Sequence, residues 1–161
     1  MLKDYMYNGS KTFHIQKAST DETTHCSSKE DAEKKMAENE KKLDELQQKL
    51  YADKKEGLIV VFQAMDAAGK DGTIAHVLQC LSPHGVYEAA FKAPSSTELA
   101  HDFLWRIAQQ VPAKGEIAIF NRSHYEDVLI GKVKQLYKSQ AHAKRIKEDE
   151  IIERRYQDIK H

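Results

Sequence analysis

The chain has 161 residues, and its 25 Lys and Arg residues balance its 25 Asp and Glu residues, so the formal net charge is zero. One domain of this length can bury a core. The charge balance argues against a general binder of nucleic acids or membrane surfaces, and no stretch approaches the roughly 20 apolar residues of a membrane span. Cys26 and Cys80 have neither metal-ligand spacing nor the density of a disulfide scaffold. We therefore expect reduced thiols in a cytoplasmic protein.

The first part of the chain divides into an arm and a helix. Residues 1–27 are polar and lack periodicity, which predicts an extended N-terminal arm. Ser27-Ser28-Lys29-Glu30 has the pattern of a capping box and predicts the start of a helix over residues 28–56. Apolar residues at helical spacing predict one buried stripe on this helix: Ala32, Met36, Leu43, Leu46 and Leu50.

The middle of the chain alternates between strand and helix patterns. The apolar, β-branched run 58–62 predicts a central strand covered on both faces. A helix is expected over residues 73–81, before Pro83, and a second strand over residues 86–91. Elements of this kind in alternation indicate a parallel sheet.

Further elements follow in the same alternation. Ser95-Ser96-Thr97-Glu98 has the pattern of a second capping box, and apolar residues at every fourth position predict a helix that runs to Val111, before Pro112. Residues 117–120 form a third strand pattern, and the charged remainder is expected to be helical.

This alternation predicts an α/β fold with a parallel sheet and helices on both sides. Three strands are fewer than the usual five or six, and the chain stops in a charged helix. We therefore expect a domain that is incomplete at the C-terminus, either truncated or completed by a partner.

The turn after the first predicted strand has the composition of a phosphate-binding loop. Small residues between a strand and a helix let backbone N–H groups converge on phosphate oxygens, and the helix N-terminus adds positive charge. Lys70 supplies a cation for the transferring phosphoryl group. Asp71 stands where a hydroxyl would bind Mg²⁺, so we expect Asp66 to bind the metal instead. The predicted phosphate contacts are Ala67, Ala68, Gly69, Lys70, Asp71, Gly72 and Thr73.

A second polar segment follows the third predicted strand. Ligands of open α/β sheets bind beyond the carboxyl ends of the strands, which places Arg122 beside the phosphate loop. Its guanidinium can hold phosphate oxygens through two donors. Glu126 and Asp127 are candidates for a metal or for donors on a ribose or base. The alternative is a polar helix start with Ser123 as the cap.

Two further polar groups have competing interpretations. Lys92 ends the second predicted strand and is either a phosphate contact or a solvated lysine. Asp102 and Arg106 are spaced for a surface ion pair within one helix. No histidine has the spacing of a metal ligand.

Four blocks in this order resemble the family-2 polyphosphate kinases, and the likeness covers residues 28–161. The blocks are Met65-Asp66-Ala67-Ala68-Gly69-Lys70-Asp71-Gly72-Thr73-Ile74, Phe91-Lys92-Ala93-Pro94, His101-Asp102-Phe103-Leu104-Trp105-Arg106 and Phe120-Asn121-Arg122-Ser123-His124-Tyr125-Glu126-Asp127-Val128-Leu129.

The resemblance implies a P-loop kinase-like three-layer sandwich related to thymidylate kinase. It also implies phosphoryl transfer between polyphosphate and AMP or ADP, with ATP as a further nucleotide partner and the direction of transfer left open, using Mg²⁺ or Mn²⁺. Asp66 would be the essential acid and metal ligand, Lys70 would bind the transferred group, and Asn121 and Arg122 would bind the reacting phosphates. Glu126 is the position associated with the choice between AMP and ADP. A homo-oligomer, either dimer or tetramer, is expected.

Three departures from the family pattern are visible. Ala64 replaces a usual Gly, and Gly131-Lys132 replaces a more familiar Val-Arg. Members of the family also continue beyond this C-terminus, with further strands and a basic lid. Two alternatives therefore stay open: an ATP-dependent nucleoside monophosphate kinase, and a truncated, catalytically silent assembly unit.

Overall fold

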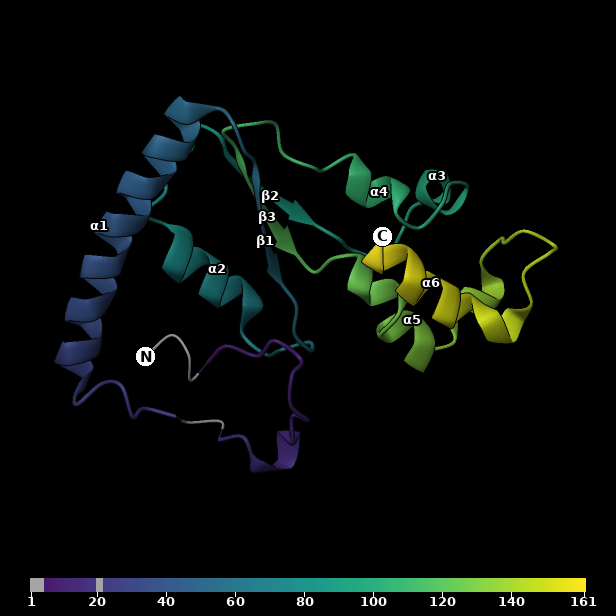
Figure 1. The fold of residues 1–161 in the computed structure, drawn as a ribbon, viewed down its shortest axis with the longest axis horizontal. Helices are drawn as coiled ribbons and strands as arrows, with labels where there is room; N and C mark the ends of the chain where they lie inside the picture. Colours follow the sequence, from purple (N-terminus) through teal and green to yellow (C-terminus); the bar gives the residue numbers. More distant parts are fainter. Residues whose placement is uncertain (1–4, 20–21) are drawn as a thin grey trace. The chain divides into compact units, whose positions relative to one another are not determined.

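The computed structural model describes residues 5–19 and 22–161, and strands alternate with helices along the chain (Figure 1). It divides into two compact units, residues 1–39 and residues 40–161, and the division falls inside the first long helix. The predicted boundary between an arm at 1–27 and a domain at 28–161 therefore stays a prediction. No helix in the described part of the chain is long and apolar enough to cross a membrane.

A short 3₁₀ helix, η2 (Ile15–Lys17), lies in the N-terminal unit. The long helix α1 (Lys29–Asp53) follows it and contains the division between the two units. The Ser28 hydroxyl accepts a hydrogen bond from the Asp31 amide at 3.2 Å, so the cap lies one residue later than the predicted Ser27 box. Hydrogen bonds from Lys35 and from the Ser27 amide lower the pKa of Asp31 to about 2. Asp31 thus stays ionised near the positive end of α1.

Three strands form a parallel sheet in the C-terminal unit, as predicted. They are β1 (Leu58–Phe62), β2 (Val86–Ala90) and β3 (Ile117–Asn121), in the order β1-β3-β2. Asn121 lies opposite both Phe62 and Ala90, so the three strands end level with one another. Polar segments that follow the three strands must therefore begin at the same edge of the sheet.

Helices cover the sheet on both faces. On one face Ile117 and Ile119 pack with Ile74 of α2 (Lys70–Leu78). On the other face Phe120 packs with Phe91 in an edge-to-face contact at 4.9 Å, and Ile107 of α4 (Trp105–Ala108) lies against them. Figure 1 shows α2 on one side of the strands and α4 on the other. The predicted layering is confirmed.

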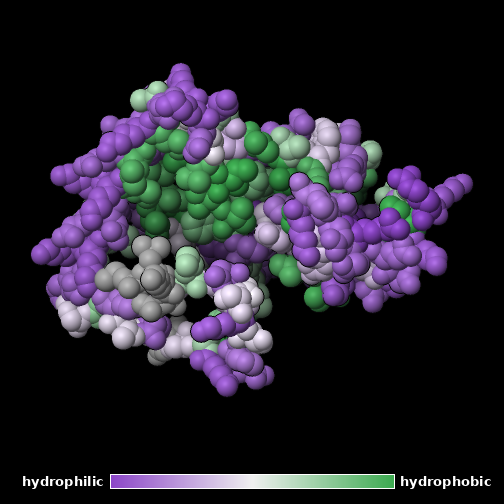
Figure 2. Space-filling view, viewed as in Figure 1, coloured by the Kyte–Doolittle hydropathy of each residue, from purple (hydrophilic) through white to green (hydrophobic). Residues whose placement is uncertain are grey.

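The prediction that the run 58–62 is a central strand is wrong. In the described residues β1 pairs with β3 alone, while β3 has a neighbour on each side. Ile59 and Val61 are each 39% exposed, on the face that α4 covers over the other strands. Figure 2 shows a hydrophobic surface patch where Figure 1 places α2 and the strands. An apolar run identifies a strand, but it does not identify the strand's neighbours.

The buried stripe of α1 also differs from the prediction. Leu46 is 60% exposed, whereas its neighbour Gln47 is 3% exposed. The Gln47 side-chain amide donates a hydrogen bond to the His84 carbonyl at 2.8 Å, which compensates for the burial of a polar group. Leu50, one turn later, packs against the core as expected.

The helix predicted from residue 95 to Val111 is broken in two. Ser95 and Glu98 form the predicted capping box at the start of α3 (Ser96–Leu99). The chain then leaves the helix, because the Asp102 carboxylate accepts a hydrogen bond from the Leu104 amide at 2.9 Å and starts a new turn. Helix α4 follows that turn.

The charged C-terminal part is helical in several short pieces. These are η3 (His124–Asp127), α5 (Ile130–Val133), η4 (Leu136–Ser139), η5 (Glu148–Glu150) and α6 (Ile151–Lys160). Gln135, with φ 54°, adopts the left-handed conformation that ends α5. Figure 1 shows α5 and α6 beyond the carboxyl ends of the strands. The fully buried Val128 and the Tyr156 hydroxyl, 3.4 Å from its carbonyl, join α6 to η3.

The burial pattern predicts a sharp contrast between two substitutions. Phe120→Ala removes a fully buried ring from β3, and we expect a loss of about 3–5 kcal/mol in the free energy of unfolding. Leu46→Ala, at the exposed position on α1, should change it by less than about 0.5 kcal/mol. Urea denaturation followed by circular dichroism measures both. Equal losses would contradict the packing described above.

Candidate functional site

A cleft of about 320 Å³ lies at the carboxyl ends of the three strands, and we call it the phosphate cleft. It is lined by Asp66, Ala67, Lys70, Asp71, Ala90, Phe91, Lys92, Ala93, Asn121 and Arg122. Segments far apart in the sequence meet here because the strands end level with one another. Five further predicted residues do not line the cleft: Ala68, Gly69, Gly72, Thr73 and Glu126.

The loop between β1 and α2 owes its shape to two left-handed residues. Gly69, at φ 84°, turns the chain into α2, and Ala67 adopts φ 61°. A Cβ at Gly69 would meet no atom within 4 Å, so the backbone angle alone requires glycine here. Ala67 has no such freedom, and a left-handed alanine is a strained conformation of the kind found at functional sites.

Lys70 begins α2 and folds back over the loop. Its ammonium lies 3.3 Å from the carbonyl oxygens of Ala64 and Met65. The Thr73 hydroxyl donates to the Gly69 carbonyl at 3.0 Å. Thr73 thus closes the first turn of α2, and the Lys70 cation lies over the loop at the cleft.

Arg122 extends the pairing of β3 with β1 by one hydrogen bond, and the backbone then leaves the sheet. Its backbone N–H donates to the Phe62 carbonyl at 3.0 Å, and its φ of 67° is left-handed. The guanidinium forms ion pairs with Asp66 and with Glu126, the latter at 3.5 Å. Asp66 of the phosphate loop therefore joins Arg122 and Glu126, from the segment after β3, in one charged group.

Asn121, the last residue of β3, connects the phosphate loop to β2. Its side-chain amide donates to Asp71 at 2.6 Å and to Glu88 at 2.9 Å. Glu88 was missed by the sequence analysis, although a charged residue inside a short strand was a usable signal. In the described part of the chain, no group of three or more His, Cys, Asp or Glu side chains is arranged to hold a metal ion.

Lys92 lines the cleft from the end of β2, and α4 holds its backbone. Arg106 donates to the Lys92 carbonyl at 2.9 Å and pairs with Glu98 at 3.1 Å. The predicted ion pair between Asp102 and Arg106 is therefore wrong, since Asp102 acts as a local cap. Arg106 instead ties α3 and α4 to the end of β2.

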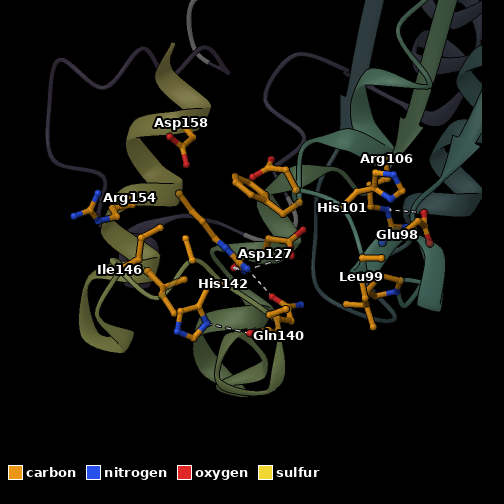
Figure 3. A pocket seen from close by; sticks show the side chains of 18 of the residues that line it. Glu98, Leu99, His101, Arg106, Asp127, Gln140, His142, Ile146, Arg154 and Asp158 are labelled. Atoms are coloured by element: carbon orange, nitrogen blue, oxygen red, sulfur yellow. Dashed lines mark hydrogen bonds and ion pairs between the residues drawn. The ribbon is translucent and has the colours of Figure 1, made fainter.

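A second cavity, of about 450 Å³, lies between residues 94–106 and residues 127–158 (Figure 3). Asp127 lies at this cavity and pairs with Arg155 of α6 at 3.5 Å. Burial raises the pKa of Asp127 even though Arg155 opposes the shift, and burial lowers the pKa of Arg155. The Arg155 guanidinium also donates to Gln140 at 2.6 Å. Asp127 therefore anchors α6, whereas Glu126 faces Arg122.

The fold and loop define a class of protein. A parallel strand, a turn with a left-handed glycine, and a lysine at the start of the next helix make this a P-loop kinase-like fold. The family model described as Polyphosphate kinase 2 (PPK2) matches residues 26–159. The chain belongs to this family.

Individual relatives give the extent of the likeness. An AMP/ADP-polyphosphate phosphotransferase of Meiothermus ruber is 43% identical over 98% of this chain and 59% of its own length. An ADP-polyphosphate phosphotransferase of Rhodopseudomonas palustris is 54% identical over 57% of this chain and 32% of its own length. The crystal structure of polyphosphate kinase 2 from Arthrobacter aurescens has a TM-score of 0.78 and 41% identity, over 91% of this chain and 50% of that one. The chain thus spans about half the length of the Meiothermus and Arthrobacter proteins.

His124, the first residue of η3 and two positions after Arg122, makes the free energy of unfolding depend on pH. Burial lowers its pKa below the ordinary 6.5. As pH falls, His124 therefore takes up a proton in the unfolded chain before it does so in the folded protein. The stabilisation that comes from neutral His124 is present above pH 6.5 and is lost as pH falls below it. Between about pH 7.5 and about pH 5.5 we expect the urea midpoint to fall, and to fall less in His124→Gln. The exposed His76→Gln variant should keep the full decrease, and an undiminished decrease in His124→Gln would contradict this assignment.

Proposed function

We propose that the protein transfers phosphoryl groups between inorganic polyphosphate and AMP or ADP at the phosphate cleft. One observation carries the proposal: the ends of all three strands deliver a cation to one cleft, Lys70 after β1, Lys92 after β2 and Arg122 after β3. Three cations on one concave surface suit a chain of phosphates, which carries negative charge along its whole length. Membership of the Polyphosphate kinase 2 family and the names of the relatives support the same donor and acceptors.

The reaction is a direct transfer. An oxygen of the AMP or ADP phosphate attacks the terminal phosphorus of polyphosphate, and the bond from that phosphorus to the bridging oxygen breaks. The shortened polyphosphate leaves with that oxygen, so no covalent enzyme intermediate forms. Lys70 and Arg122 stabilise the charge on the transferring phosphoryl group, while the backbone N–H groups of residues 67–73 and Lys92 orient the phosphates.

Asp66 is the proposed protein ligand of Mg²⁺, or of Mn²⁺ in its place. Its side chain is 82% exposed at the cleft, which fits the way Mg²⁺ binds through one or two carboxylates together with water and substrate phosphates. When bound, the ion would neutralise charge on the phosphates. Asp66 would then give up its ion pair with Arg122 and bind the metal ion. The Arg122 guanidinium would become available to bind phosphate.

Asn121 has a supporting part in the reaction. Its amide donates to both Asp71 and Glu88, and so fixes the first turn of α2 against β2. We propose that Asn121, which lines the cleft, both orders the phosphate loop and binds the reacting phosphates.

Lys70→Ala should lower phosphoryl transfer by about 100-fold or more, because it removes a charge that stabilises the transition state. The assay supplies AMP or ADP with polyphosphate and Mg²⁺ and measures the new nucleotide by chromatography. Lys114→Ala, an exposed lysine just before β3 at the opposite end of the sheet, is the matched control and should retain full activity. Transfer from ATP to AMP without polyphosphate would instead identify a nucleoside monophosphate kinase. Turnover unchanged by Lys70→Ala would identify a contaminant.

Glu126→Gln should change the preference between AMP and ADP. The carboxylate shares Arg122 with Asp66, and its loss leaves more positive charge for an acceptor that carries the larger phosphate group. We expect the ratio of kcat/KM for ADP to that for AMP to rise about tenfold. Glu153→Gln, on the exposed side of α6, serves as the control. An unchanged ratio would remove Glu126 from nucleotide selection.

Two features of the whole protein belong to the same proposal. We expect a homo-oligomer, a dimer or a tetramer, and the exposed Ile59 and Val61 of β1 support an association surface. We also expect a cytoplasmic location, which agrees with the free thiols of Cys26 and Cys80.

A further inference from the structure

Gln63, the first residue after β1, uses both ends of its side-chain amide. Its nitrogen donates to Glu126 at 2.5 Å, and its oxygen accepts from the Ser123 hydroxyl at 3.1 Å. Both partners lie about 60 residues further along the chain. The side chain thus connects the start of the phosphate loop to the segment that follows β3.

The chemistry of the partners determines how this amide is oriented. An ionised Glu126 can only accept hydrogen bonds, so it requires the Gln63 nitrogen. Ser123 is 2% exposed, and its oxygen already accepts from the Tyr125 amide at 3.2 Å, so its hydrogen is available for the Gln63 oxygen. A glutamate or an apolar residue at position 63 cannot satisfy both partners at neutral pH.

The connection continues to the cation of the cleft. Glu126 holds Arg122 with its second oxygen at 3.5 Å, and Arg122 reaches Asp66 on its other side. The Asp66 side chain is 82% exposed, whereas that of Glu126 is only 20% exposed. Glu126 therefore keeps its ion pair with Arg122 when Asp66 gives up its own ion pair to bind another ligand.

We propose that Gln63 is a positioning residue that locks Glu126 and thereby directs the Arg122 guanidinium into the phosphate cleft. Gln63 does not line the cleft and carries no charge, so it acts through its two partners. The orientation of Arg122 is an inference from this structure alone. Its consequence for catalysis and for the choice of nucleotide rests on the proposed function.

The test compares Gln63→Glu with the exchanged pair Gln63→Glu/Glu126→Gln. The single variant places two carboxylates face to face and breaks the bond. The exchanged variant restores an amide–carboxylate hydrogen bond with the roles reversed: the amide introduced at position 126 donates to the carboxylate introduced at position 63, which still accepts from Ser123. Gln109→Glu, at an exposed position after α4, controls for the added charge.

The first readout is independent of activity. In protein labelled with ¹⁵N-arginine, we expect the Arg122 side-chain N–H signal to exchange faster with water in Gln63→Glu than in the wild type. In the exchanged variant it should exchange no faster than in Glu126→Gln, which has the same amide at position 126. The Arg155 signal should stay constant in all variants, which separates a local change from unfolding. An Arg122 signal that is unchanged in Gln63→Glu, or that exchanges faster by the same factor when Gln63→Glu is added to Glu126→Gln, overturns the proposal.

The second readout is phosphoryl transfer. Loss of a hydrogen bond to a charged group predicts a decrease of about tenfold or more in kcat/KM for polyphosphate in Gln63→Glu. Adding Gln63→Glu to Glu126→Gln should cost little further activity, because the amide–carboxylate hydrogen bond is then present with its roles reversed, whereas Gln109→Glu should match the wild type. A wild-type protein without transfer would refute the proposed function, and the arginine signals would still decide the role of Gln63. Unchanged transfer in Gln63→Glu would overturn its role in the reaction.

Discussion

The parallel pairing of β3 with both neighbours is the interaction on which the site depends. Asn121 lies level with Phe62 and Ala90, so the segments that follow the three strands begin at the same edge of the sheet and meet at the cleft. The pairing of the Arg122 amide with the Phe62 carbonyl extends this register one residue past β3. A shift of one residue in either pair would turn the last side chains of that strand to the opposite face of the sheet. The buried Phe120 ring holds the register from within the core.

Two of the three cations of the phosphate cleft, Lys70 and Arg122, are held by acceptors from the same chain. The Lys70 ammonium rests on loop carbonyls, and Arg122 is shared by two carboxylates. Such internal partners limit the repulsion among like charges before a ligand binds. They also favour a ligand that can replace several acceptors at once, because each lost internal bond must be compensated. A phosphate chain with many oxygens meets this requirement better than a single small anion.

Local sequence signals predicted the elements well where one chemical pattern dominated. The three strands lie within one residue of their predicted ends, and the Ser95 capping box is present. The segments that meet at the cleft were also predictable, because carboxyl ends of parallel strands share an edge. Errors arose where a distant contact competed with a local pattern. Gln47 is buried in place of Leu46, and its side-chain amide donates to the distant His84 carbonyl. Asp102 ended a helix that the apolar spacing would have continued.

The side-chain network could not be predicted, because it joins residues that are about 50 to 60 positions apart. No spacing rule relates Gln63 to Glu126 or Asn121 to Asp71. Their contacts follow from the strand order, which an apolar run does not encode. Glu88 was the one member of the network with a usable signal in the sequence. An acidic residue within a five-residue strand indicates a polar partner at the sheet edge.

The proposed binding of a phosphate chain in one cleft at the strand ends is tested most directly by titration. The protein, labelled with ¹⁵N, is titrated with tripolyphosphate in the presence of Mg²⁺. We expect the largest amide shifts on residues 66–73, 92–93 and 121–122, with small changes in α1 and α6. Shifts confined to the lysine-rich surface of α1 or to the cavity beside Asp127, or no shifts at all, would contradict binding in this cleft.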